Sequence, residues 1–241
     1  MALIQMSFMA GSLSRYTDLS VYLPLDPQAG MDRAPRPRFR TLYLLHGYGG
    51  SDMDWVVNSR LVPLARRYGL AVVMPEGDNS FYLDFPERTE NYHTFISREL
   101  VDFTRKVFPL SDKREDTFIG GLSMGGGAAV RACFEDGDVF SKAAALSPGL
   151  MLGEETKRLG HNSDLYELYL QAKENKKEIS QLMITIGDRD PQLWMSRQFH
   201  AFLVKEGMDH RYEEGPGAHD WDFWDGHLEE VLAWLTQGGV S

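Results

Sequence analysis

Residues 116–130 constrain the fold of this chain more than any other segment. They read DTFIGGLSMGGGAAV, in which a short apolar run precedes Gly-Leu-Ser-Met-Gly at 121–125 and an Ala-rich run typical of a helix follows. A serine at a tight strand-to-helix turn has strained backbone dihedral angles, so the residues two before and two after it must be small. Gly121 and Gly125 meet this requirement. A bare G-x-S-x-G match is weak, and the glycines at 125–127 could form only a flexible loop, but the flanking strand and helix favour Ser123 as a nucleophile.

The rest of the chain alternates short apolar runs with longer helical patterns. The apolar runs fall at residues 41–45, 70–74, 117–119, 143–146 and 182–186, and helical spacing is clearest at 95–107 and 223–235. This alternation predicts an α/β fold in which helices cover a mostly parallel sheet. Residues 4–9 and 19–23 are expected to form antiparallel edge strands and 210–214 the last strand, which brings the sheet to about eight strands.

The composition fits one sizeable domain over residues 1–241. The chain is 43% hydrophobic, which is enough for an ordinary buried core. Residues 153–177 lie between the fourth and fifth parallel strands and are polar and helix-prone. We expect them to form a small helical cap inserted into the domain.

Charge and hydropathy exclude some classes of partner. A formal net charge of -10 repels phosphate backbones and argues against nucleic-acid binding. The mean hydropathy of -0.34, and the lack of any apolar run near the roughly 20 residues that span a bilayer, argue against a membrane partner. Residues 1–10 lack the basic start of a secretory signal.

Cys133 is the only cysteine, so no intrachain disulfide can form. A reducing compartment follows as the expectation, and we predict a cytoplasmic location. Cys133 lies within the helix expected after Ser123, which favours a packed thiol over a second nucleophile.

Attack by a serine creates an oxyanion that needs two converging donors. The Met124 N–H, at the start of the helix, is one candidate. Residues 41–50 (TLYLLHGYGG) form a strand that ends in His-Gly and a flexible turn, and we choose the Tyr48 N–H there as the second donor. His46 sits at the strand end and is expected to be structural.

The base should follow the nucleophile and the acid in the chain, which discards His46 and His93. His219 follows the last expected strand, in a loop of small residues at 215–218 that can return an imidazole to Ser123. We therefore predict His219 as the base. His161, in the presumed cap, remains a rival.

The acid should follow the strand at 182–186, in the sequence GDRDP at 187–191. Asp188 and Asp190 compete for this role. Asp190 lies further along the loop towards the histidine and is preferred, and Asp188 would then be a cap or a partner of Arg189. Spacing alone does not settle the choice.

Several segments together resemble the esterase D-like group of α/β hydrolases, particularly its tributyrin-esterase branch, over nearly the whole chain. The matching segments are residues 20–24 (SVYLP), 44–47 (LLHG), 73–75 (VMP), 79–82 (NSFY), 121–126 (GLSMGG) and 217–221 (GAHDW). The resemblance implies an α/β-hydrolase fold and cofactor-free hydrolysis of short acyl esters such as acetyl and butyryl esters. It further implies activity on acetylated or feruloylated saccharides in some members, an intracellular location and frequent homo-oligomers.

The family's Gly-x-x-Asp pattern maps onto Gly187 and Asp190, which supports Asp190 as the acid. Asp188 stands where the family commonly has a small residue. The related S-formylglutathione hydrolases usually have a histidine before the serine, where this chain has Leu122, so thioester hydrolysis ranks lower.

An acyltransferase and an inactive binding module are both compatible with this sequence. The first would use the same scaffold to pass the acyl group to an alcohol, and the second would share only the fold. We expect no metal site, because the chain has no His-Glu-x-x-His motif and one cysteine. For the substrate pocket we name Trp55, Asn79, Phe81 and Tyr82, which could equally be ordinary core residues.

Overall fold

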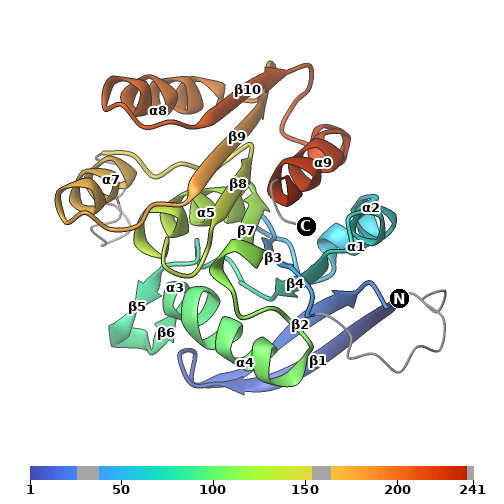
Figure 1. Cartoon of the computed structure of the whole chain (residues 1–241). Helices are drawn as coiled ribbons and strands as arrows, with labels where there is room; N and C mark the ends of the chain where they lie inside the picture. The colour runs from blue at the N-terminus through green and yellow to red at the C-terminus, as the bar shows by residue number, and fades with distance from the viewer. Residues whose placement is uncertain (26–37, 154–163, 238–241) are drawn as a thin grey trace.

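The computed structural model describes residues 1–25, 38–153 and 164–237. Its main feature is an eight-stranded sheet in the order β1-β2-β4-β3-β7-β8-β9-β10 (Figure 1). The strands are β1 (Ala2–Ala10), β2 (Arg15–Leu23), β3 (Thr41–Leu45), β4 (Ala71–Pro75), β7 (Thr117–Leu122), β8 (Lys142–Leu146), β9 (Gln181–Gly187) and β10 (Arg211–Gly215).

The strand directions confirm the predicted α/β architecture. β4, β3, β7, β8, β9 and β10 pair in parallel, whereas β1 pairs with β2, and β2 with β4, in antiparallel fashion. β7 lies inside the sheet between β3 and β8, so its C-terminal end is flanked by strands on both sides. It is longer than the predicted 117–119, because Gly120, Gly121 and Leu122 continue the ladder up to the serine.

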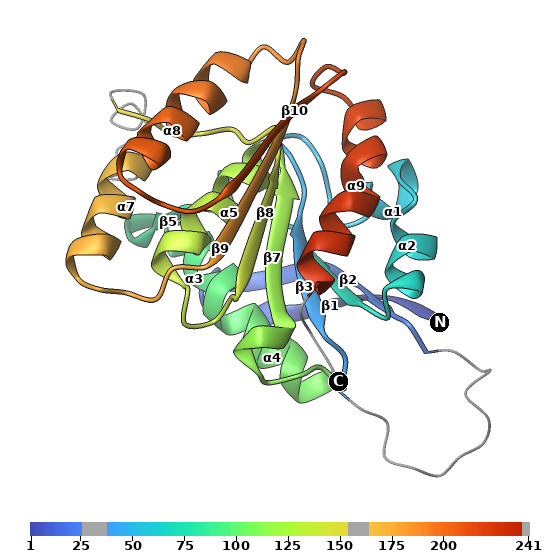
Figure 2. The ribbon, with the colours of Figure 1, turned by 45° about the horizontal axis from the view of Figure 1, so that its top comes forward.

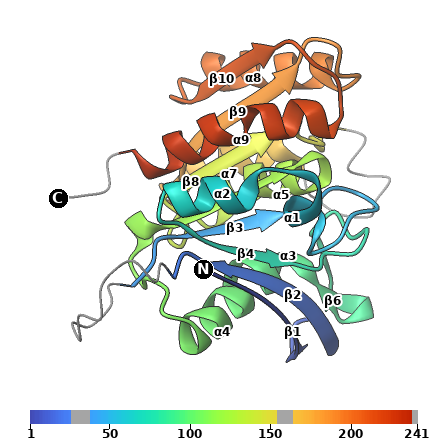
Figure 3. The same ribbon diagram turned by 90° about the vertical axis from the view of Figure 1, so that its right-hand side faces the viewer.

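Helices cover both faces of the sheet, as Figures 2 and 3 show. One face carries α4 (Leu100–Val107), α5 (Ser123–Glu135), α7 (Leu165–Glu174) and α8 (Leu193–Lys205), and the other carries α1 (Asp54–Asn58), α2 (Leu61–Arg67) and α9 (Trp221–Thr236). Alternate residues of β3 face opposite helical layers, with Tyr43 bonded to Thr104 of α4 and Leu44 in the cluster that contains α9. This two-residue period places a hydrophobic core on each side of the sheet.

Shorter elements connect β4 to α4. They comprise β5 (Asp84–Phe85), η1 (Pro86–Arg88), β6 (Glu90–Asn91), α3 (Tyr92–Thr94) and η2 (Phe95–Glu99), a π-helical stretch, and η3 (Arg114–Asp116) precedes β7. β5 and β6 form a small antiparallel ladder that the sequence analysis did not predict.

The predicted cap at 153–177 is described only in part, because residues 154–163 lie outside the described residues. α7, which falls within it, packs on α5 and α8. Tyr169 makes an edge contact with Phe134 of α5, and Tyr166 contacts Phe202 of α8. The described part of this segment thus belongs to the helical layer on that face of the sheet.

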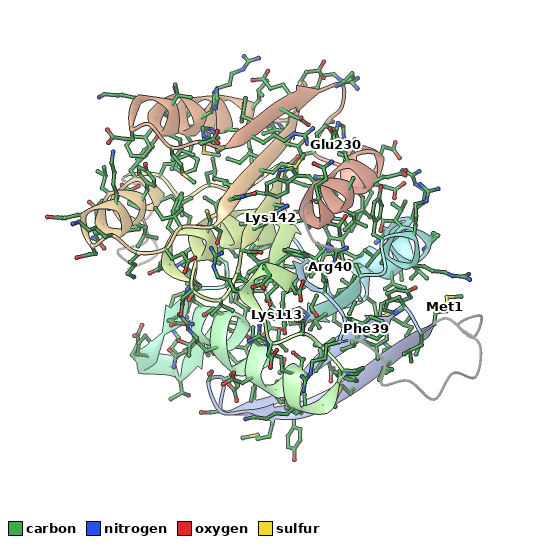
Figure 4. All side chains as sticks on the ribbon, viewed as in Figure 1. Met1, Phe39, Arg40, Lys113, Lys142 and Glu230 are labelled. Carbon is green, nitrogen blue, oxygen red and sulfur yellow. The ribbon has the colours of Figure 1, made fainter. Side chains whose placement is uncertain are left out.

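The C-terminal end of α9 is held against the sheet by two cations, labelled in Figure 4. Arg40 donates to the carbonyl of Thr236, and Lys142 donates to the carbonyls of Trp234 and Gln237. These bonds satisfy carbonyl groups that a helix end leaves unpaired. Because α9 begins directly beside His219, its anchoring also fixes that loop. Among the helices of the described ranges, none has the length and apolarity of a membrane span.

Candidate active site

Ser123 lies where β7 turns into α5. Its φ of 50° is in the left-handed region, which non-glycine residues seldom adopt. A Cβ on Gly121 would lie 2.6 Å from the carbonyl carbon of Gly125, and one on Gly125 would lie 2.6 Å from the carbonyl oxygen of His46. Both glycines are therefore required for the backbone to pass so closely, as the sequence predicted.

The structure brings Ser123, His219 and Asp190 together from three distant segments. The Oγ of Ser123 lies 3.0 Å from Nε2 of His219, and Nδ1 of His219 lies 2.8 Å from Oδ2 of Asp190. A carboxylate can only accept, so Nδ1 carries the proton, which leaves Nε2 to accept the serine hydroxyl. This is the geometry of a serine nucleophile paired with a base that a buried acid orients.

The two aspartates of the β9–α8 loop have different environments. The Asp190 side chain is fully buried, and its Oδ1 accepts from the Gln192 amide at 2.8 Å. Asp188 is exposed, accepts from the Gly217 amide at 3.1 Å and lies 3.7 Å from the Arg189 guanidinium. The structure thus joins Asp190 to His219, and it places Asp188 as a brace between the two loops and a partner of Arg189.

Hydrogen bonds keep Asp190 charged. Burial acts to raise the pKa of Asp190, but the bonds from His219 and the Gln192 amide outweigh it and lower that pKa below its ordinary value. An ionised Asp190 stabilises a protonated His219, which is the state that follows transfer of a proton from Ser123.

The start of α5 and the turn after β3 carry the predicted oxyanion donors. Met124 is buried at the N-terminal end of α5, where the helix dipole favours an anion. Tyr48 lies in the turn after β3, and its exposed ring contacts Phe81 at a centroid distance of 5.7 Å. Asn79 accepts from the Gly49 amide at 2.6 Å, which fixes the turn that carries Tyr48.

His46 is buried at the end of β3, and its ring contacts Gly47, Gly77 and Glu76. Its Nδ1 donates to the carbonyl of Gly47 at 2.7 Å, and its Nε2 lies 2.9 Å from the Gly77 amide and 3.2 Å from Oε1 of Glu76. Burial disfavours the charged ring, but the bonds to Glu76 and Gly47 outweigh it and raise the pKa of His46. The structural role expected for His46 agrees with these contacts.

A first cavity, of about 290 Å³, opens at the nucleophile itself. Ser123, His219, Tyr48, Trp221 and Trp224 are among the residues that line it. The Trp224 ring is perpendicular to His219 at a centroid distance of 5.1 Å and to Trp221 at 5.3 Å. The base is therefore packed against an aromatic wall.

A second and much narrower pocket begins next to the nucleophile at Met124 and Gly149. The Gly149 amide donates to the Ser123 carbonyl at 2.7 Å. Phe81 lines this cavity, and Arg131 brings a positive charge to its lining. Among the residues that the structure describes, the two cavities have different linings, so Ser123 stands between two separate spaces.

Of the four predicted pocket residues, Phe81 lines a cavity and Asn79 instead holds the turn of Tyr48. The other two, Trp55 and Tyr82, lie in the core, which corrects the sequence prediction. Trp55 is fully buried, donates through Nε1 to the Leu45 carbonyl at 3.1 Å and lies beneath Trp221. Tyr82 is also fully buried and directs its hydroxyl to the His46 carbonyl. Neither side chain can reach a substrate, because both are used to hold the loops around β3.

Trp221 and Trp224 line the cavity at Ser123 although neither is predicted from the sequence as a pocket residue. The sequence does contain a signal for these two residues, namely an aspartate that can cap a helix directly after His219. Asp220 caps α9 by accepting from the Phe223 amide at 3.1 Å. A helix that starts there places residues three apart on one face. Arg131, seven positions after Met124 on α5, is a further cavity residue that the sequence did not predict. His161, the rival base, lies outside the described residues.

The sheet, the strained serine at the β7–α5 turn and the histidine after β10 define an α/β serine hydrolase. Residues 10–235 match the Esterase family model, described as "Putative esterase". The chain belongs to this family and hydrolyses carboxylic ester bonds, which confirms the esterase D-like resemblance found in the sequence.

The chain is similar to one characterised enzyme in sequence and to two serine hydrolases in structure. The chain is 35% identical to the acetyl esterase of Caldicellulosiruptor saccharolyticus, covering 98% of this chain and 99% of that protein. Among solved structures, it resembles the fluorophosphonate-binding serine hydrolase FphF of Staphylococcus aureus (28% identity, 98% of both chains, TM-score 0.88). It also resembles the S-formylglutathione hydrolase FrmB of Staphylococcus aureus (28% identity, 98% of this chain and 99% of that one, TM-score 0.87).

Proposed function

We propose that this esterase acts through an acyl-enzyme on Ser123. His219 takes the proton of the serine hydroxyl through Nε2, and Oγ attacks the ester carbonyl carbon. His219 then returns the proton to the leaving alcohol, and Asp190 holds the imidazole in the required tautomer. The observation that supports this proposal is the continuous chain of contacts, 3.0 Å from Ser123 to His219 and 2.8 Å from His219 to Asp190.

The oxyanion of the tetrahedral intermediate would be bound by the amides of Tyr48 and Met124. Both residues flank Ser123, and the Asn79 side chain holds the turn on which Tyr48 lies. Removal of one such donor costs about 10²- to 10³-fold in rate in other enzymes. In the second half of the reaction, water deprotonated by His219 would release the acid and regenerate Ser123.

Small acyl esters are the substrate class we propose. The acetyl esterase relative supports this class, and the small cavity beside Met124 suits a short acyl group. Acetylated or feruloylated saccharides belong to the same chemical class, and the open cavity at His219 is wide enough for a sugar alcohol.

Thioester hydrolysis is the second candidate, since the FrmB structure is similar over 98% of this chain. Leu122 before the nucleophile argues for ester over thioester. An acyltransferase would share every step up to the acyl-enzyme, and it would differ only in the acceptor that resolves it.

A substrate panel separates these possibilities. We would compare kcat/KM for p-nitrophenyl acetate and butyrate, a feruloyl ester and S-formylglutathione, and analyse the products with an added sugar alcohol. Wild type and Ser123→Ala would be labelled with a fluorophosphonate. Loss of labelling and of all ester hydrolysis in Ser123→Ala is expected, and retention of full activity would refute Ser123 as the nucleophile.

The sequence also supports proposals about the partners and the cellular location of this esterase. We infer no nucleic-acid partner from the net charge of -10, a cytoplasmic location from the single cysteine, and a homo-oligomer from the family resemblance. Size-exclusion chromatography with light scattering would test the oligomer, and cell fractionation would test the location.

A further inference from the structure

The cavity beside Met124 follows one face of α5. Met124, Gly127, Ala128 and Arg131 all line it, and their positions recur at the spacing of a single helix face. Gly127 and Ala128, in the middle of this face, keep it free of bulky side chains. Arg131 follows Met124 by seven helical positions, which is roughly 10 Å along the helix axis.

Apolar side chains from other segments form the remaining walls. Phe81 and Leu83 come from the loop after β4, Met151 from the segment after β8, and Leu165 from the start of α7. These walls fit hydrocarbon rather than a sugar ring, whose hydroxyls need polar partners.

Proton transfer decides which part of the ester enters this cavity. His219 must reach the leaving oxygen to protonate it, so the alcohol lies in the cavity that His219, Trp221 and Trp224 line. The acyl carbonyl stays at Ser123, and the acyl chain extends away from the leaving oxygen. The separate cavity that begins at Met124 is then the acyl subsite.

The far part of this subsite is polar. The Arg131 side chain is 16% exposed, and its Nε lies 2.5 Å from Oε2 of Glu135. His93 also contacts this carboxylate, with its Nε2 3.5 Å from Oε2 of Glu135 and 2.9 Å from Oδ2 of Asp136. The guanidinium is therefore fixed in place, and its charge is balanced by Glu135.

We infer that Arg131 determines acyl specificity in this esterase: it limits the length of purely hydrocarbon acyl groups and favours acyl chains that carry an uncharged oxygen acceptor near their far end. A hydrocarbon chain that reached Arg131 would desolvate the guanidinium without replacing its hydrogen bonds, which is costly. A keto or hydroxyl oxygen there would accept from it. A carboxylate is less suitable, because Glu135 already balances the charge.

This inference rests on the proposed acyl-enzyme at Ser123. The test measures kcat/KM for p-nitrophenyl esters of butyrate, hexanoate, octanoate, 5-oxohexanoate and glutarate. Hexanoate and 5-oxohexanoate have equal chain length and differ only in the keto oxygen, so their ratio reports the end group. The ratio of octanoate to butyrate reports the length limit.

Arg131→Met removes the charge while retaining a long side chain. We expect wild type to prefer 5-oxohexanoate over hexanoate by about tenfold, and Arg131→Met to abolish that preference and to raise the octanoate-to-butyrate ratio by about tenfold. Arg98→Met is the matched control, because Arg98 pairs with Asp136 and Asp138 and does not line the cavity. Its two ratios should equal those of wild type.

Unchanged ratios in Arg131→Met would overturn the inference, as would a glutarate ester hydrolysed faster than the 5-oxohexanoate ester by wild type. Thermal unfolding and fluorophosphonate labelling would show that the variant is folded and reactive, and Arg131→Gln would replace it if it were not. A different result, full activity in Ser123→Ala, would refute the proposed mechanism. The two failures are thus distinguishable.

Discussion

Oδ2 of Asp190 lies 2.8 Å from Nδ1 of His219, and the Asp190 side chain is fully buried while that of His219 is 23% exposed. The acid is thus shielded from water and aimed at the ring nitrogen that does not face Ser123. Its other oxygen accepts from the Gln192 amide, so the carboxylate has little freedom to turn. This contact holds the proton on Nδ1, so that Nε2 of His219 can act as the base for Ser123.

Replacement of Asp190 by Asn should therefore act on the rate. The Asn side chain can donate to Nδ1, which would leave the proton on Nε2 and prevent His219 from accepting the serine proton. We expect kcat for p-nitrophenyl acetate to fall by about 10⁴-fold, the loss known when the acid of a serine protease triad is replaced in this way. Steady-state kinetics at pH 7.5 would measure it.

Asp188→Asn provides the matched control for that variant. Its side-chain oxygen can still accept from the Gly217 amide, and only an exposed contact with Arg189 is lost. We expect kcat within about threefold of wild type, since exposed ion pairs contribute little. Equal losses in the two variants would contradict the assignment of Asp190.

Much of this site could be predicted because each of its parts has its own short sequence signal. The glycines around Ser123 are required by backbone contacts within one turn, and the position of His219 after the last strand follows from the order of elements. The choice of Asp190 was less secure from spacing. Asp188 and Asp190 share one loop, and only the packing of that loop against Gly217 shows which carboxylate is buried.

The pocket residues could not be predicted in the same way. Trp55 and Tyr82 are aromatic residues close in sequence to the site, but the direction of a side chain depends on tertiary packing, and both point into the core. Trp224 and Arg131 reach the cavities because they lie one and two turns along helices that start at the site. The single-domain organisation stays a prediction.

The pair formed by His46 and Glu76 should make stability depend on pH. Hydrogen bonds to Glu76 and Gly47 raise the pKa of His46 against the effect of burial, and the bond with His46 lowers the pKa of Glu76 against the same effect. The contribution of Glu76 is present above its unfolded pKa and is lost as pH falls through its lowered folded pKa. The contribution of His46 is present below its unfolded pKa and is lost as pH rises through its raised folded pKa.

The stabilising effect of the pair is therefore largest in mildly acidic solution. Glu76→Gln should reduce the free energy of unfolding more at pH 5.5 than at pH 8.5, as measured by urea denaturation of wild type and variant. The Gly77 amide competes for Nε2 of His46 and favours the neutral ring. If that bond dominated, the difference between wild type and variant would be the same at both pH values.

Cys133 should be unreactive in the folded protein. The side chain is fully buried and its thiol donates to the Ser180 carbonyl at 3.2 Å. Burial raises the pKa of the Cys133 thiol far above its ordinary value, which removes the thiolate that an alkylating reagent requires. Iodoacetamide at pH 8 should leave the native protein unmodified by mass spectrometry and add one group in urea. Rapid labelling of the native protein would contradict this burial.

Gly125→Ala should damage both stability and reactivity, because a Cβ at this position would lie 2.6 Å from the His46 carbonyl oxygen and 2.7 Å from Cβ of Leu45. Backbone atoms of β3 cannot move aside without shifting the turn that carries Tyr48. We expect a loss of about 1–3 kcal/mol in the free energy of unfolding, the usual effect of overpacking. The rate of fluorophosphonate labelling at Ser123 should also fall.

Gly226→Ala tests whether that loss comes from crowding rather than from substitution of a helical glycine in general. Gly226 lies within α9, and apart from its chain neighbours and the nearby backbone of α9, a Cβ there would meet no described atom within 4 Å. Alanine is a better helix former, so this variant should be more stable than wild type by up to about 1 kcal/mol. Labelling of Ser123 should proceed at the wild-type rate. A stable, fully reactive Gly125→Ala protein would show that the turn between β7 and α5 tolerates a side chain, and that the close contact with His46 does not hold Ser123 in place.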